Sequence, residues 1–279
     1  MTAGDAVADV TSWAAAAAAG ARRLRAMHGG TQPLILPNVW DPVSARAFAD
    51  AGFGALATSS SAVAATLGYR DGQTPGEEML AAVARIARSV GVPVTADVEN
   101  GYGLGPAELV VRLAEAGVAG CNLEDSDPVA RVLTDPGQQA DYLAAVRAEA
   151  SQNLVINARV DVFVRDPARS ALAGPDGAAA LAAAVDGAVA RAQRYLDAGA
   201  DCVYPIIAPT EALAELVRRI PGPVNAMFVP GGPSLAQLAG LGLARISFGG
   251  GLHARASQQV GAMACALAQD QRIGSDSTP

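Results

Sequence analysis

Three acidic residues lie at the ends of two neighbouring β-rich runs. Asp97 and Glu99 are two positions apart, and Glu124 ends the next run. Side chains two apart on a strand point to the same face. Clustered carboxylates repel one another, so they are tolerable only when protons or a cation neutralise them. Oxygen ligands select a hard cation, and we predict Mg²⁺ or Mn²⁺ bound by Asp97, Glu99 and Glu124. For any one acid, the alternative is a helix cap or an ion pair.

A positive side chain follows on the next run. Arg159 could hold a substrate carboxylate or phosphonate through two parallel hydrogen bonds. It could instead form a structural ion pair with Asp161 or Glu124. A strand-to-helix turn nearby has backbone N–H groups that can bind an anion, and it carries Ser59, Ser60 and Ser61.

The elements that position these residues form a regular series. Eight β-rich runs alternate with helical segments, and the runs cover residues 34–40, 55–60, 93–99, 120–125, 154–163, 202–207, 224–229 and 245–248. This alternation predicts an α/β fold, a (β/α)8 TIM barrel of parallel strands. An open doubly wound sheet is the alternative, but no G-x-G-x-x-G follows the first run. Active sites of barrels lie at the carboxyl ends of the strands, which adds Trp40, Tyr204 and Asn225 as candidates.

The chain length fits one domain. With 279 residues, we expect a single α/β barrel, with an N-terminal helix within residues 1–30 and a frayed tail at 273–279. The last helix, from about residue 253 to 271, needs a surface to cover its apolar stripe of Val260, Met263, Ala264 and Leu267.

The composition excludes several chemistries. All 20 basic residues are arginine, so Schiff-base and P-loop lysine chemistry is impossible. Only two histidines exist, which excludes a three-histidine zinc site. The net charge of -7, without a basic block, argues against a nucleic-acid partner, and no segment predicts a membrane span. Three widely spaced cysteines favour a reducing cytoplasm.

Taken in order, several segments resemble the isocitrate lyase and phosphoenolpyruvate mutase superfamily. They run from about Leu34 to Leu252 and read LPNVWDPVSARAFADAGF, TSSSAVAATLGYRDG, VTADVENGYG, GVAGCNLEDS, INARVDVF and PVNAMFVPGGPSLAQLAGLGLARISFGG. Together they are far more specific than any one of them.

The resemblance implies a barrel whose last helix swaps between the subunits of a homodimer or homotetramer. It implies Mg²⁺ held, partly through water, by Asp97, Glu99 and Glu124, with Asp71 beside it. It also implies a small carboxylate substrate, a 2-oxo acid or its enolate. The Ser59–Ser60 turn would hold the carboxylate, and Arg159 would balance charge.

The departures from the family pattern bear on the reaction. The lyases carry a Lys-x-Cys-Gly-His gate after the fourth-strand glutamate, whereas this chain reads SDPVAR at 126–131. The lyases also place a glutamate after the sixth-strand aromatic-proline pair, where this chain reads YPII at 204–207. The mutases place a lysine in the gate, and this chain has no lysine.

We therefore expect a Mg²⁺-dependent lyase or decarboxylase that breaks a C–C bond in a small 2-oxo or 2-hydroxy acid and leaves an enolate. Asp71, Arg159 and Tyr204 are the expected catalytic residues. One alternative is C–P chemistry of the phosphonopyruvate hydrolase or phosphoenolpyruvate mutase type. Another is a non-catalytic barrel that binds 2-oxo acids.

Overall fold

Parallel strands form the centre of the molecule. The computed structural model describes residues 3–127, 130, 132–165 and 176–275. Each of the eight predicted runs contains a strand, which confirms the predicted alternation. These strands are β1 (Leu34–Leu36), β2 (Asn38–Val39), β3 (Leu56–Thr58), β4 (Val94–Asp97), β5 (Gly120–Glu124), β8 (Val155–Val160), β9 (Cys202–Pro205), β10 (Asn225–Met227) and β11 (Arg245–Ser247).

The strands pair in two parallel sheets. One sheet has the order β2-β3-β4-β5-β8-β9, and the other has the order β1-β11-β10. The first predicted run is divided between the sheets at Pro37, which has no N–H to donate. A parallel bridge between Val203 and Val224 links β9 to the residue before β10. A short antiparallel ribbon, β6 (Ser126–Asp127) with β7 (Val132–Leu133), follows β5.

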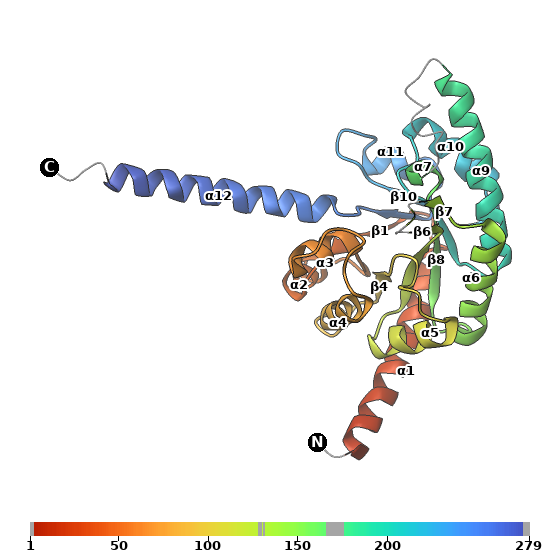
Figure 1. Ribbon diagram of the computed structural model, residues 1–279, viewed down its shortest axis with the longest axis horizontal. Helices are drawn as coiled ribbons and strands as arrows, with labels where there is room; N and C mark the ends of the chain where they lie inside the picture. Colours follow the sequence, from red (N-terminus) through yellow and green to blue (C-terminus); the bar gives the residue numbers. More distant parts are fainter. Residues whose placement is uncertain (1–2, 128–129, 131, 166–175, 276–279) are drawn as a thin grey trace.

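Helices alternate with the strands and lie around them (Figure 1). They are α1 (Ala3–Met27), α2 (Pro42–Asp50), α3 (Ser60–Leu67), α4 (Gly76–Ala87), α5 (Pro106–Glu115), α6 (Pro136–Ala150), α7 (Val162–Arg165), α9 (Gly177–Asp197), α10 (Thr210–Arg219), α11 (Leu235–Ala239) and α12 (Gly251–Ser275). The predicted strand 154–163 was too long, because β8 ends at Val160 and α7 begins two residues later.

The main core lies between the strands and the helices. Alternate residues of β8 belong to this core, namely Ile156, Ala158 and Val160. Asn157 and Arg159 lie between them in the sequence, so they point to the opposite side, which we call the inner face of the strands. A smaller cluster at the amino ends of the strands packs Ala21 and Leu24 of α1 against Leu36 and Val155.

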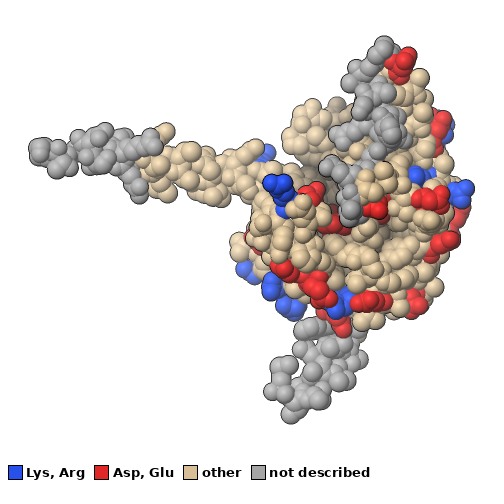
Figure 2. Space-filling model, viewed as in Figure 1, with Lys and Arg blue, Asp and Glu red and all other residues tan. Residues whose placement is uncertain are grey.

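Helix α12 projects away from the rest of the chain (Figure 1). Figure 2 shows it as an arm almost free of charged side chains over its described length. Val260, Met263 and Leu267 are 60%, 58% and 65% exposed on it. The helix continues through Ser275, and residues 276–279 of the predicted tail lie outside the described residues. None of the described helices combines the length and apolar character needed to cross a membrane.

Candidate active site

Two buried acids and one half-buried acid gather where β4 and β5 end. Asp97 is the last residue of β4 and Glu124 the last of β5, whereas Glu99 lies two residues beyond β4. Glu99 has a φ of 51°, in the left-handed region, so the expected strand alternation does not extend to it. The Glu124 N–H donates to the Glu99 carbonyl oxygen at 2.8 Å, which holds the two acids together. Glu99 and Glu124 are only 6% and 5% exposed.

The acids disfavour one another's charge. Burial raises the pKa of the Glu99 carboxyl to about 7, and the charges of Asp97 and Asp71 add to this shift. Asp71 lies in the loop between α3 and α4, close enough for its charge to act on Glu99. Burial raises the pKa of Glu124 to about 8, although Arg159 favours its charged form. Without a cation, both carboxyls therefore hold a proton more readily than an exposed glutamate does.

The serine turn contacts the acids directly. The side chain of Asp97 accepts hydrogen bonds through Oδ2 from the backbone N of Ser60 at 3.2 Å and from its Oγ at 2.8 Å. Ser59 caps α3 through Ala62 N and lies 3.0 Å, Oγ to Oγ, from Ser61. A Cβ added to Gly250, after β11, would lie 2.9 Å from Ser61 Oγ. Ser60 therefore orients Asp97, and the glycine loop after β11 lies against the same turn.

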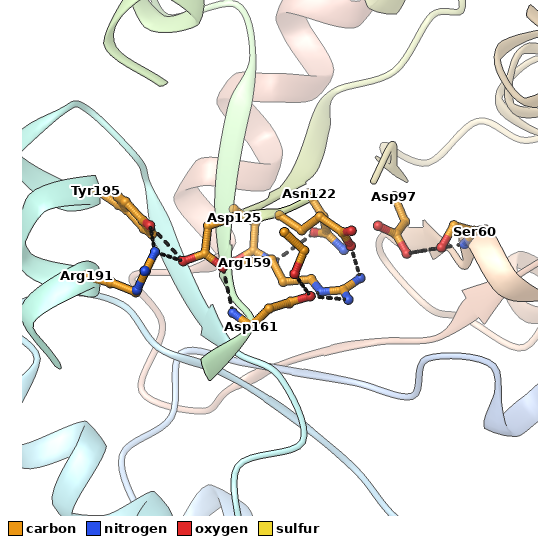
Figure 3. A network of polar contacts seen from close by, with 11 residues as sticks. Ser60, Asp97, Asn122, Asp125, Arg159, Asp161, Arg191 and Tyr195 are labelled. Atoms are coloured by element: carbon orange, nitrogen blue, oxygen red, sulfur yellow. Dashed lines mark hydrogen bonds and ion pairs between the residues drawn. The ribbon is translucent and has the colours of Figure 1, made fainter. Parts of the chain in front are cut away.

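Arg159 lies between two carboxylates. Its Nη1 lies 2.7 Å from Glu124 Oε2. On its other side it donates to Asp161, from Nε at 2.6 Å and from Nη2 at 2.9 Å (Figure 3). The ion pairs expected as an alternative for Arg159 are therefore present. Because a guanidinium has five N–H groups, these contacts leave donors available for an incoming anion.

Asp161 is itself held by a second group of residues, which the sequence did not indicate. Its N–H donates to Asp125 Oδ1 at 2.7 Å. The other oxygen, Asp125 Oδ2, accepts from Tyr195 Oη at 2.7 Å and from Arg191 Nη1 at 3.0 Å, both on α9 (Figure 3). Ser126 Oγ donates to Asp161 Oδ2 at 2.7 Å. Helix α9 thereby fixes Asp161, which fixes Arg159.

The other predicted residues lie on β2, β9 and β10 or follow them. Tyr204 is buried, and burial raises its pKa to about 12, so the phenol keeps its proton near neutral pH. Asn225 accepts from Ser247 Oγ at 3.3 Å, and its Nδ2 has no partner among the described residues. The Trp40 ring packs edge-on against His253 of α12, with 5.1 Å between the ring centroids.

The acids suit a divalent cation bound partly through water. Asp97 Oδ1 and Glu99 Oε1 are buried and have no hydrogen-bond partner in the described part of the chain. Hard cations take such oxygens as ligands. Within that same part, no group of three or more acidic, histidine or cysteine residues is arranged to hold a metal ion, so water would have to supply the further ligands. Tyr102, which was not predicted as a site residue, adds a buried hydroxyl. Burial and the nearby acids hold the pKa of this phenol well above its usual value.

Comparisons with known proteins show the family to which the chain belongs. The family model described as phosphoenolpyruvate phosphomutase matches residues 24–268. A probable 2-methylisocitrate lyase 2 of Corynebacterium glutamicum is 34% identical over 203 residues, which is 69% of this chain and 59% of the relative. An oxaloacetate decarboxylase of Rhodopseudomonas palustris is 31% identical over 216 residues, which is 76% of this chain and 70% of the relative.

A solved structure is similar along most of the chain. The crystal structure of a putative phosphonomutase from Burkholderia cenocepacia J2315 has 38% sequence identity and a TM-score of 0.78, covering 88% of this chain and 98% of the other. The family match spans most of the chain, including every residue of the candidate site. This protein is therefore a member of the phosphoenolpyruvate mutase family, within the isocitrate lyase/phosphoenolpyruvate mutase superfamily.

Proposed function

We propose that this protein is a Mg²⁺- or Mn²⁺-dependent carbon–carbon lyase or decarboxylase acting on a small 2-oxo or 2-hydroxy carboxylic acid through an enolate. The observation that carries the proposal is the group of buried acids, with two unpartnered oxygens, beside Arg159. Asp97, Glu99 and Glu124 would hold the cation. When bound, the cation would act as a Lewis acid that stabilises negative charge on the substrate oxygens.

The side chains of this protein would perform the remaining tasks. The free N–H groups of Arg159 bind the substrate carboxylate, and Asp161 keeps the guanidinium plane fixed. Ser59 and Ser61 belong to the serine turn at the start of α3 and form one side of the substrate site. Trp40 and Asn225 are the other residues that we assign to it. Asp71 adds charge next to Glu99. Cleavage of the C–C bond leaves its electron pair on the substrate as an enolate.

The enolate carbon must then take up a proton. Tyr204 retains its phenolic proton at neutral pH, and it is the donor we assign to this step, with water as the alternative. The cysteines do not serve because of where they lie: Cys121 belongs to the core that faces the helices, Cys202 begins β9 two residues before Tyr204, and Cys265 lies on α12. Because the lyase gate cysteine has no counterpart here, we expect oxaloacetate to be a better substrate than 2-methylisocitrate.

Chelation and a substrate panel test the proposal. EDTA should abolish pyruvate release and Mg²⁺ or Mn²⁺ should restore it, whereas activity that survives chelation would refute the mechanism. The ratio of kcat/KM for 2-methylisocitrate to that for oxaloacetate should lie below one. A ratio above one would show that another acid replaces the gate cysteine.

A second candidate is C–P chemistry, because the similar Burkholderia structure is described as a putative phosphonomutase. Phosphonopyruvate in the same panel separates the two, since a hydrolase would release phosphate as well as pyruvate and a mutase would form phosphoenolpyruvate. Oxalate binding without turnover of any panel member would instead support a non-catalytic barrel that binds 2-oxo acids.

We also propose the assembly that this site requires. The Val203–Val224 bridge and the division of the first strand at Pro37 support one closed (β/α)8 barrel made from both sheets. The exposed apolar side chains of α12 support its swapping onto another copy in a homodimer or homotetramer. The three free cysteines support a reducing compartment such as the cytoplasm.

A further inference from the structure

One buried arginine has no counter-charge beside it. Arg245 begins β11 and is 0% exposed. Its one hydrogen bond within the described residues joins Nη2 to Asn122 Oδ1 at 3.3 Å. Its Nε and Nη1 have no partner there, and it takes part in none of the ion pairs found among those residues. Because a guanidinium keeps its proton in proteins, the interior contains an unpaired positive charge.

Strand register places this charge just below the acids. Ile246 belongs to the core that faces the helices, so Arg245 points to the inner face. Its partner, Asn122, precedes Glu124 by two residues on β5 and is the register partner of Asp97 on β4. The hydrogen bond crosses from one sheet to the other. The residue that Arg245 contacts, Asn122, therefore lies one layer beneath Glu124 and in register with Asp97.

Further polar atoms of this layer also lack partners within the described residues. Acceptors lie on β4 and β8, at Thr95 Oγ1 and Asn157 Oδ1, and Asp97 Oδ1 lies above them. Donors lie on β10 and β11, at Asn225 Nδ2 and on Arg245. Ordered water commonly bridges buried groups of this kind. We call Thr95, Asn122, Asn157, Asn225 and Arg245 the polar layer.

The charge acts on the site above it. Burial lowers the pKa of the Arg245 guanidinium, while Cys202, Tyr204 and Asp97 favour its charged form. The charges of Arg245 and Asp97 therefore attract each other, although the two side chains form no ion pair. Stability does not explain the arginine, because an unpaired buried charge is less favourable than an apolar side chain of similar size.

We propose that Arg245 is a positioning residue that supplies the site with a fixed positive charge from beneath, strengthening the binding of an anionic substrate and weakening the binding of the divalent cation. This inference rests on the function proposed above. The charge acts through space, without contact with the substrate. Arg159 meets the substrate carboxylate from the site itself, whereas Arg245 balances the charge of the strand-end acids from below.

Two binding measurements with opposite expected signs test the role. Arg245→Met replaces the charge with an unbranched apolar chain, and Arg245→Lys retains the charge. Calorimetry measures Mg²⁺ binding without other ligand, and then oxalate binding at saturating Mg²⁺. For the unit charge of Arg245 about 10 Å from a doubly charged ion, at an effective dielectric constant of about 20, Arg245→Met should bind Mg²⁺ tighter and oxalate weaker, each by on the order of 100-fold. Arg245→Lys should stay close to wild type.

Stability and two substitutions at Asn122 complete the test. The urea midpoint of Arg245→Met should equal or exceed that of the wild type. Asn122→Asp, which places a carboxylate beside the guanidinium, should shift both affinities in the same directions as Arg245→Met. Asn122→Leu removes the hydrogen bonds that Asn122 Oδ1 accepts from Arg245 and Asn157, without changing charge, and should shift neither affinity.

Three results would overturn the inference. Unchanged affinities in Arg245→Met would show that the charge does not reach the site. Weaker binding of both Mg²⁺ and oxalate, with a lower urea midpoint, would show a purely structural role. If the wild-type protein binds neither ligand, the proposed function fails and the inference fails with it, and the wild-type titration alone identifies that case.

Discussion

Replacing Arg159 with lysine separates its contacts with protein carboxylates from its proposed contact with substrate. The guanidinium donates twice to Asp161 and lies 2.7 Å from Glu124 through Nη1. Both carboxylates are buried, with side chains 0% and 6% exposed. An ammonium at residue 159 must satisfy them before it can bind anything else, because a buried carboxylate without a partner is costly.

The hydrogen-bond count gives the size of the effect. Arginine has five N–H donors and lysine has three. Two donors of the lysine are needed for Asp161 and Glu124, so at most one remains for the substrate. The substrate carboxylate loses at least one charge-assisted hydrogen bond, worth about 1.5–3 kcal/mol. The value of kcat/KM for oxaloacetate should therefore fall roughly 10- to 100-fold.

Arg191→Lys is the matched control. Arg191 pairs with Asp125 in a similar setting: the arginine side chains of the two pairs are 14% and 12% exposed, and the aspartates 0%. Urea unfolding should show a similar loss in both variants, on the order of 1–3 kcal/mol. Only Arg159→Lys should lose kcat/KM in steady-state assays with Mg²⁺. Near wild-type kcat/KM in Arg159→Lys, or an equal loss in both variants, would refute the substrate role.

Three further predictions concern stability and assembly. Burial lowers the pKa of His28 to about 4, below the 6.5 of an unfolded histidine, so the folded chain binds fewer protons between these values. Stability present above pH 6.5 should fall by up to about 3 kcal/mol as the pH drops through 4, and urea unfolding of His28→Leu should lack that dependence. Tyr195→Phe removes the 2.7 Å hydrogen bond to Asp125 and should lower the unfolding free energy by about 1–2 kcal/mol, with kcat/KM within about twofold of wild type. Sedimentation should show an oligomer that becomes monomeric in the double variant Val260→Glu, Leu267→Glu, whereas a monomeric wild type would contradict the swapped helix.

The strands could be predicted because local patterns determine where they begin. Short runs rich in β-branched residues, separated by glycine, proline and amphipathic segments, matched all eight strand positions. The end of β8 was different. The apolar residues Val162 and Phe163 extend the β pattern, yet they form α7. The Asp161 N–H bonds a side chain, Asp125 Oδ1, just beyond β8, and no local pattern reports that contact.

The site divides in the same way. The acids could be located from sequence because parallel strands bring their carboxyl ends together. The partners of Asp125 could not, because Arg191 and Tyr195 lie 66 and 70 positions away along the chain. On α9 the two residues are four apart, a spacing that any helix surface shows. Only the packing of α9 against β8 brings both side chains to Asp125, and that packing cannot be recognised from the four-residue spacing.

The helix-facing side chains of the strands stabilise the fold, whereas the inner side chains form the site. This separation explains how the fold tolerates so much buried charge. Parallel strands covered on both sides are usually apolar throughout. Here the helix-facing residues, such as Ile156 and Ala158, are apolar, whereas the inner residues Asn157 and Arg159 are polar. Burial of apolar area on the helix-facing side stabilises the fold and offsets the desolvation of the inner side. It follows that an apolar replacement such as Arg245→Met can alter the site without unfolding the chain.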